Sequence, residues 1–280
     1  MTVDRFSGTF EAQAPISHGS DEDFGMEQRL RTIEMAVRED GDLYHEEIPV
    51  VSGNSLRGQL RDLLAEDLLG RLSEDDEPLQ IHDTLSNALY SGGTLERGAG
   101  PGKLKRRMVA NIRENIPMLS LLGTAIGSQM VQGRLNMGML TPIATETESY
   151  TGRDSEHSVF EFVDETFYTR LDDREGHVER DEDEQAQQMR YTVQILTPGT
   201  RFDHWMALEN ATEIERACLG HAFDMFAESP HVGGQRSVGH GRVRFEYDDS
   251  LPDADAYTEF IADNRGDIRE FVLDLDEQVA

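Results

Sequence analysis

Apolar and polar positions alternate along several short stretches of the chain, and each alternation predicts a β-strand. The first strand is expected over residues 3–14, and a second alternation follows at Ile33, Met35 and Val37. Two more strands are expected in MRYTVQILTPGTRFDHWMALE, on either side of the turn TPGT, and RVRFEY predicts a last one. These strands would form the framework of a sheet.

Helical periodicity separates these strands. The stretch IPVVSGNSLRGQLRDLLAEDLLGRL predicts a short strand that breaks at SGNS into a helix capped by Asn54 or Ser55. The apolar stripe of this helix would be Leu56, Leu60, Leu63, Leu64 and Leu68. Further helices are expected over residues 81–90, early in the segment 115–145, and on the stripe Ile214, Ala217, Cys218, His221, Met225 and Phe226. The element order predicts an α+β fold with a ferredoxin-like antiparallel sheet that carries a large insertion.

The insertion is expected at residues 146–190, where periodicity gives way to a segment rich in Asp, Glu and Gln. Only HSVFEFVDETFYTRL in it has the pattern of a strand or hairpin. Residues 1–145 and 191–248 would then form the sheet domain with helical additions. Residues 249–280 would form an acidic C-terminal helix that is broken at Gly266.

Charge places the protein in an unusual class. The chain has 55 Asp and Glu against 26 basic residues, a net charge of −29, and only Lys103 and Lys105 of the basic residues are lysines. This bias towards arginine and acid is typical of a proteome adapted to very high salt. At molar salt the Debye length is about 3 Å, so net charge says little about the partner and the local charge pattern says more.

Cysteine content and hydropathy indicate the compartment. The single cysteine, Cys218, excludes an internal disulfide and a cysteine-based metal site. No apolar run approaches the length of a membrane span, and MTVDRFSGTF has no signal-peptide pattern. We therefore expect a cytoplasmic protein with no membrane partner, no metal and no cofactor.

Acidic residues are missing from one long segment. Between Arg97 and Thr145 only Glu114 is acidic, whereas six basic residues fall within residues 97–113. The stretch RGAGPGKLKRRMVANIR is too polar and too rich in Gly and Pro to be core, so we interpret it as a phosphate-binding loop. The basic residues at its centre are Lys103, Lys105, Arg106 and Arg107. The alternative is a solvated loop that pairs with the protein's own acids.

Two smaller stretches are also free of acid. In VGGQRSVGHGRVRF, the glycines at 233, 234, 239 and 241 permit positive φ and close approach, and Gln235, Arg236, Ser237 and His240 supply donors. In SGNSLRG, backbone amides at a helix N-terminus form an anion site, with Arg57 and Arg61 one turn apart. Each stretch alone also fits a purely structural role, as a connecting loop in the first case and as a capped helix in the second.

Together these motifs resemble a known family. IPVVSGNSLRGQLRDLL is similar to the I-P-x-x-S-G-x-S-L-R/K-G motif of the RAMP superfamily, which builds CRISPR effector complexes, and VGGQRSVGHGRVRF is similar to its C-terminal G-G-x-x-x-x-G-x-G-R-V loop. The central ALYSGGTLERG and the stretch from IPMLSLLG to TPIATET resemble the backbone subunits of type IV complexes and related archaeal systems. The resemblance covers most of residues 7–247.

The resemblance implies a modified RRM-like palm that polymerises along a guide RNA, with residues 146–190 in the position of a thumb. It places Ser52, Asn54, Ser55, Arg57 and Arg61 of the first motif, and Gly233, Gly234, Gln235, Arg236 and Ser237 of the second, on the RNA backbone. With His240 and the four central residues of the basic loop, these form the predicted RNA-binding set. The partners implied are CRISPR RNA, target nucleic acid bound through the guide, other effector subunits and further copies of the chain. The acidic thumb departs from this pattern, because it offers only Phe160, Phe162, Phe167 and Tyr168 for stacking.

Catalysis is the main alternative to a non-catalytic scaffold. Type III relatives cleave target RNA with an aspartate in a loop near the first strand, and SDEDFG offers Asp21, Glu22 and Asp23 in a comparable place. In a halophile such an acidic loop is usually surface, so Asp21 and Asp23 are secondary candidates. A third alternative is a protein-assembly module whose basic loop contacts the acidic face of a neighbouring copy.

Overall fold

The computed structural model describes residues 2–20, 27–39, 41–74, 77–93, 106–126, 129–170 and 189–279 of the 280-residue chain. The strands are β1 (Val3–Ala12), β2 (Glu27–Gln28), β3 (Thr32–Glu39), β4 (Asp42–Pro49), β5 (Thr124–Ile126), β6 (Gln129–Val131), β7 (Leu135–Met137), β8 (Thr141–Pro142), β9 (Val163–Arg170), β10 (Met189–Leu196), β11 (Arg201–Glu209) and β12 (Val243–Tyr247). The helices are α1 (Gly53–Leu72), α2 (Asp83–Tyr90), α3 (Arg106–Asn115), α4 (Pro117–Leu122), α5 (Glu148–Thr151), α6 (Glu213–Glu228), α7 (Asp255–Asp263) and α8 (Arg265–Val279).

The central sheet has the strand order β12-β1-β11-β7, with β8 also paired to β11, and all of these pairs are antiparallel. Taken along the chain, β1, α1, β7, β11, α6 and β12 form the β-α-β-β-α-β series of a ferredoxin-like domain. The predicted α+β, RRM-like fold is therefore confirmed. The inner face of the sheet is apolar, and Phe10 of β1 and Phe202 of β11 are fully buried there.

Helix α1 forms because leucines recur at helical spacing over twenty residues. Leu56, Leu60, Leu64 and Leu68 are fully buried, each contributing about 1.5–3 kcal/mol of apolar burial. The helix is capped two or three residues before the position predicted at Asn54 or Ser55. Its N-cap is Ser52, whose side chain accepts a hydrogen bond from the Ser55 amide at 3.3 Å. The predicted cap was wrong because both residues already lie in the first turn.

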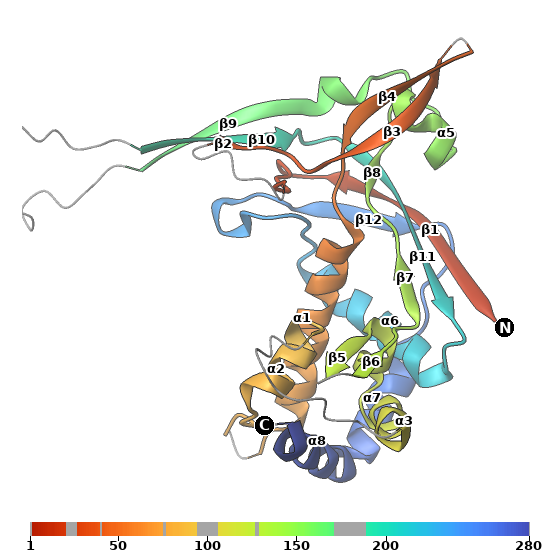
Figure 1. Ribbon diagram of the computed structural model, residues 1–280, viewed down its shortest axis with the longest axis vertical. Helices are drawn as coiled ribbons and strands as arrows, with labels where there is room; N and C mark the ends of the chain where they lie inside the picture. The colour runs from red at the N-terminus through yellow and green to blue at the C-terminus, as the bar shows by residue number, and fades with distance from the viewer. Residues whose placement is uncertain are drawn as a thin grey trace, which may run out of the picture.

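The molecule has two ends (Figure 1). The helices α1–α4 and α6–α8 gather at one end, and the hairpins β3–β4 and β9–β10 project at the other. Strand β10 pairs with β9 and with β2, whereas β11, which follows it after the turn at Thr197–Thr200, belongs to the central sheet. The β9–β10 hairpin therefore extends beyond residue 190, where the insertion was predicted to end.

Three boundaries differ from the sequence-based expectation. Strand β1 ends at Ala12, and the C-terminal segment forms two helices that part at Asn264, two residues before Gly266. The basic segment expected as a loop becomes helix α3 from Arg106 onward, where Ile112 is fully buried and the helix packs on α4. Among the described helices, none has the length and apolar character needed to cross a membrane.

Candidate functional site

Residues 13–20, which follow β1, join the two predicted binding motifs. The Gly234 amide donates to the Ser17 carbonyl at 2.7 Å, and the Gly241 amide donates to the Pro15 carbonyl at 2.8 Å. His18 of the same segment contacts the first motif, because its Nε2 accepts a hydrogen bond from the Ser52 amide at 3.2 Å. The start of α1 and the glycine loop, which we define as residues 231–241, therefore lie along one edge of the molecule.

The start of α1 has the electrostatics of an anion site. The first amides of a helix lack acceptors within the helix and carry part of the positive end of its dipole. Ser52 satisfies the Ser55 amide, and Asn54 is exposed beside it. The first turn contains no acidic residue, in a chain with 55 of them. A phosphate oxygen at this helix start would meet N–H donors and no carboxylate from the turn itself.

Two glycines of the loop are required by the protein's own packing. Gly233 has φ +75°, and a Cβ on it would lie 2.4 Å from the Ser17 carbonyl oxygen. Gly241 has φ +87°, and a Cβ there would lie 2.4 Å from the Val232 carbonyl oxygen. The close approach that the sequence suggested for a ligand is thus made by neighbouring backbone. Gly239, at φ +89°, faces open space.

The donors of the glycine loop are arranged on its outside. Gly234, Arg236 and Ser237 are exposed, and one guanidinium nitrogen of Arg236 donates to the Ser229 hydroxyl at 2.9 Å. Gln235 is half-buried at φ +60°, and its side-chain amide donates to the Gln28 side chain at 2.7 Å. The loop is therefore held from within and presents its remaining N–H groups to solvent.

The β9–β10 hairpin touches the glycine loop, a contact that sequence reasoning did not find. The Tyr168 hydroxyl of β9 and Nε2 of His240 form a hydrogen bond. Only 5% of His240 is exposed, its Nδ1 has no partner among the described residues, and burial lowers its pKa. His240 also lines a cavity of about 270 Å³ between α1, α6 and the loop. The sequence showed Tyr168 only as a possible stacking surface.

The two arginines of the first motif have different surroundings from those expected. Arg57 is half-buried and donates to the Leu135 carbonyl of β7 at 2.6 Å. Arg61 is only 5% exposed and donates to the carbonyls of Leu122 and Gly123 at 3.2 and 2.9 Å. Burial, with the charge of Arg57 as a smaller cause, lowers the pKa of Arg61 to about 10. The guanidinium of Arg61 is thus enclosed by α1 and the α4–β5 turn, and its RNA contact stays a prediction.

The predicted basic loop lies apart from this edge as far as it is described. Lys103 and Lys105 fall outside the described residues, as does the side chain of Arg106, which begins α3. Arg107 is exposed on α3, which packs on α4 at the helical end of the molecule (Figure 1). The catalytic candidates Asp21 and Asp23 also fall outside the described residues. Within the described part, no group of three or more His, Cys, Asp or Glu residues could hold a metal ion.

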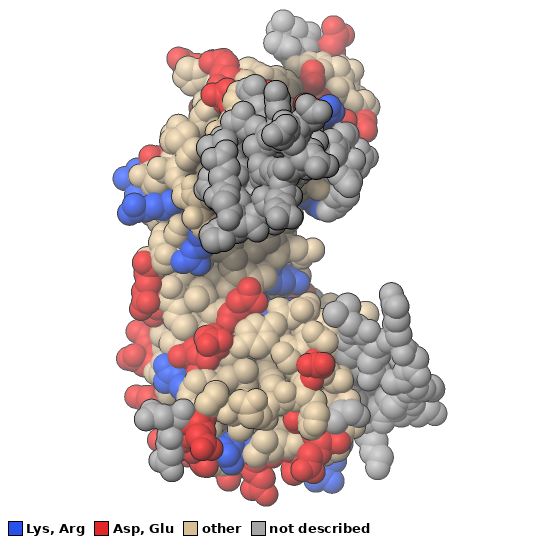
Figure 2. All heavy atoms as spheres, turned by 90° about the vertical axis from the view of Figure 1, so that its left-hand side faces the viewer, with Lys and Arg blue, Asp and Glu red and all other residues tan. Residues whose placement is uncertain are grey.

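Charge on the face that contains α1 is unevenly distributed (Figure 2). At the height of the glycine loop and the start of α1, this face shows Lys and Arg atoms beside uncharged surface, whereas Asp and Glu atoms lie over the helical end and at the opposite, hairpin end. The exposed arginines between residues 231 and 247 are Arg236, Arg242 and Arg244, the last of which pairs with Glu11 at 2.7 Å. The edge defined above is thus locally more basic than the chain as a whole.

Comparison with known proteins agrees with this architecture. The family model of the RAMP superfamily matches residues 41–244, which include both motifs. Among solved structures, a chain of a "Type IV-B CRISPR Complex" is similar with a TM-score of 0.59 and 24% identity, over 89% of this chain and 94% of that chain. None of the curated proteins matches the sequence.

Proposed function

Since the chain belongs to the RAMP superfamily, we propose that it is a non-catalytic backbone subunit of a CRISPR effector complex that binds the guide RNA. The observation that carries the proposal is the convergence of the α1 start and the glycine loop on one edge, through hydrogen bonds of both to residues 15–18. The similarity of nearly the whole fold to a chain of a Type IV-B CRISPR complex supports the assignment.

The chemistry of this edge suits an RNA of any sequence. Backbone amides and side-chain donors bind phosphate and sugar oxygens without reading bases. Ser52, Asn54 and Ser55 would hold one phosphate at the helix start. Arg236 and Ser237, which are exposed, would hold the backbone beside it, and Gly234, whose amide already donates to Ser17, would let the RNA approach closely. Gly233, Gln235 and His240 would fix the loop from behind. Arg57 and Arg61 would have a structural role, because their guanidinium groups donate to the carbonyls of Leu135 and of Leu122 and Gly123.

The remaining partners follow from a backbone role. The β9–β10 hairpin would act as the thumb, because Tyr168 links it to the glycine loop and half-exposed Phe167 offers a stacking surface. Lys103, Lys105, Arg106 and Arg107 would form a second RNA contact. Further copies would bind along the guide in the cytoplasm, together with other effector subunits, and the target would bind through the guide.

Asn54→Asp is the sharpest test, because it should affect folding and RNA binding in opposite directions. An acid in the first turn interacts favourably with the helix dipole, by about 0.3–1 kcal/mol, so the variant should fold at least as well as the wild type. A carboxylate at the same place would repel a phosphate. Protein purified from a high-salt host in molar KCl should therefore carry short RNAs with CRISPR repeat ends, and Asn54→Asp should carry several-fold less.

Gln80→Glu is the matched control. Gln80 is exposed between α1 and α2, and the substitution makes the same charge change outside the proposed site. It should leave the RNA content unchanged. If the wild type instead carries no nucleic acid and forms a discrete oligomer, the proposal fails and a protein-assembly module takes its place.

A further inference from the structure

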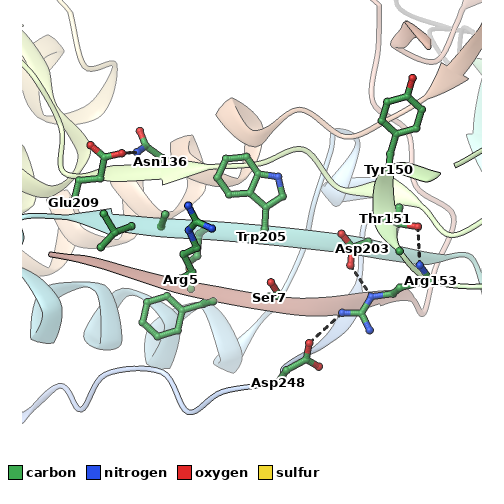
Figure 3. Close-up of a pocket in the computed structure, with 15 residues that line it drawn as sticks. Arg5, Ser7, Asn136, Tyr150, Thr151, Arg153, Asp203, Trp205, Glu209 and Asp248 are labelled. Carbon is green, nitrogen blue, oxygen red and sulfur yellow. Dashed lines mark hydrogen bonds and ion pairs between the residues drawn. The ribbon is translucent and has the colours of Figure 1, made fainter. Parts of the chain in front are cut away.

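The outer face of the central sheet carries a hollow that the guide-binding edge does not use. Strands alternate, so Arg5 and Ser7 of β1 and Asp203 and Trp205 of β11 point away from the helices. Together with the segment that follows α5, they line a hollow of about 800 Å³ (Figure 3). Trp205, the only tryptophan of the chain, is 50% exposed in it. An exposed aromatic ring inside a hollow is typical of a binding site.

The surroundings of Trp205 fix the indole and keep it accessible. A Cβ on Gly138 would lie 2.6 Å from the indole Nε1, so the ring rests directly against a residue without a side chain. The Gly138 amide also donates to the Trp205 carbonyl at 2.8 Å. The cross-strand neighbour on β1 is the small residue Ser7, and the next outward position on β11 is Ala207. The ring is thus supported on one side and uncrowded on the other.

Arg5 supplies the free charge of the hollow. Arg153 is held by Asp203 at 2.6 Å and by Asp248 at 3.2 Å, and Glu209 accepts from the Asn136 side chain at 2.8 Å. The side chain of Arg5 is exposed and has no ion pair or hydrogen bond to any residue that the structure describes. Figure 3 shows its guanidinium beside Trp205, above the same strands.

We propose that this hollow binds a nucleotide unit, with its base stacked on Trp205 and its phosphate on Arg5. An indole face accepts any base, and a guanidinium provides the fork of donors that a phosphate needs. The side-chain oxygens of Asn136 and Glu209 lie at the same hollow as acceptors for a base amine or a ribose hydroxyl. Because stacking does not depend on charge, it remains effective at molar salt, where Coulomb attraction is screened within about 3 Å.

The proposal goes beyond the guide site and does not rest on it. The two regions are neighbours, since a Cβ on Gly53 at the start of α1 would lie 2.5 Å from the Gly138 carbonyl oxygen. The indole of Trp205 lies against the same Gly138. The hollow nevertheless contains none of the residues assigned to the guide. It would hold either a nucleotide of a second single strand or a free nucleotide.

The test uses the emission of the single tryptophan in full-length protein freed of nucleic acid, in molar KCl. We expect saturable quenching on titration with a single-stranded oligoadenylate or oligouridylate, and none with an abasic strand. Quenching by AMP or UMP at a concentration similar to the oligonucleotide would identify a pocket for free nucleotides. Quenching by the strand at much lower concentrations would identify a strand site. Both outcomes support the proposal.

Variants separate stacking from other causes. Arg5→Ala should weaken the quenching titration about two- to fivefold, the range of one exposed charge contact, whereas Arg38→Ala, an exposed arginine of β3, should not. Trp205→Ala should weaken strand binding about tenfold, measured by fluorescence anisotropy of a labelled strand, and Trp205→Phe, which keeps a stacking ring, should lose less.

Three results would overturn the proposal. They are the absence of quenching by any nucleotide, equal titrations for wild type and Arg5→Ala, and an emission change that follows protein concentration alone. The last would identify the hollow as a contact between copies. Failure of the guide site can be told apart from failure of the hollow. The guide site is tested by the RNA that copurifies with the wild type and with Asn54→Asp, whereas the hollow is tested by the quenching of Trp205.

Discussion

Gly233 and Gly239 allow a direct measurement of what holds the glycine loop in place. Both have positive φ, +75° and +89°, so replacing either by alanine brings a similar backbone strain of about 1 kcal/mol. They differ in surroundings. A Cβ at Gly233 would lie 2.4 Å from the Ser17 carbonyl oxygen, whereas a Cβ at Gly239 would have nothing within 4 Å.

The overlap at Gly233 can be relieved only if the loop moves away from residues 15–18. That movement would break the hydrogen bond of 2.7 Å from the Gly234 amide to the Ser17 carbonyl, at a further cost of about 1–2 kcal/mol. We therefore expect Gly233→Ala to lower the free energy of unfolding by about 2–3 kcal/mol and Gly239→Ala by about 1 kcal/mol.

Urea unfolding in molar KCl, followed by the emission of Trp205 in the central sheet, measures both values. RNA copurification should follow the same order, because Gly233→Ala displaces the exposed donors of the loop while Gly239→Ala leaves them in place. Equal destabilisation by the two substitutions would refute the view that the Ser17 contact holds the loop.

Two further predictions concern buried polar groups. Arg61→Met should lower the free energy of unfolding by about 3 kcal/mol, since it leaves the carbonyls of Leu122 and Gly123 without donors, yet RNA affinity of the folded variant should stay unchanged. A variant of normal stability that loses RNA would restore Arg61 as a contact. Burial lowers the pKa of His204 from 6.5 to about 4, so its contribution to stability is complete above pH 6.5 and falls by about 3 kcal/mol towards pH 4. His204→Asn keeps an acceptor for the Tyr247 hydroxyl and should remove this part of the pH dependence in unfolding curves; identical slopes would contradict it.

The fold could be predicted from the sequence because each of its main elements shows a pattern within a single segment of the chain. Alternation at β1, β3 and β12 and the leucine stripe of α1 each follow from one segment, and their order along the chain indicates the ferredoxin-like sheet. The two acid-free motifs at residues 52–58 and 232–245 were also visible as composition. Their meeting through residues 15–18 was not, because that segment has no pattern of its own.

The environment of Arg61 could not be predicted for a related reason. Four residues from Arg57, it shares a helix face with it, and the sequence suggested a solvent face for both. Arg61 also precedes Leu64 by three residues, which places it at the margin of the buried stripe. Whether such a marginal position is enclosed depends on the packing partner. Here that partner is the α4–β5 turn, whose carbonyls at Leu122 and Gly123 could be located only in three dimensions.

The acidity of the chain is compatible with two nucleotide-binding regions because electrostatics at molar salt is local. A carboxylate acts only on groups within about 3 Å, so what matters is the absence of acid at the contact itself. The first turn of α1 contains none. At the sheet hollow Asp203 and Asp248 pair with Arg153 and Glu209 accepts a hydrogen bond from Asn136, so the Arg5 side chain is left without an ion pair. In both regions the ligand would meet hydrogen-bond donors or an aromatic face, interactions that salt weakens little. The distribution of acid, rather than its total, therefore determines where this protein can bind a nucleic acid.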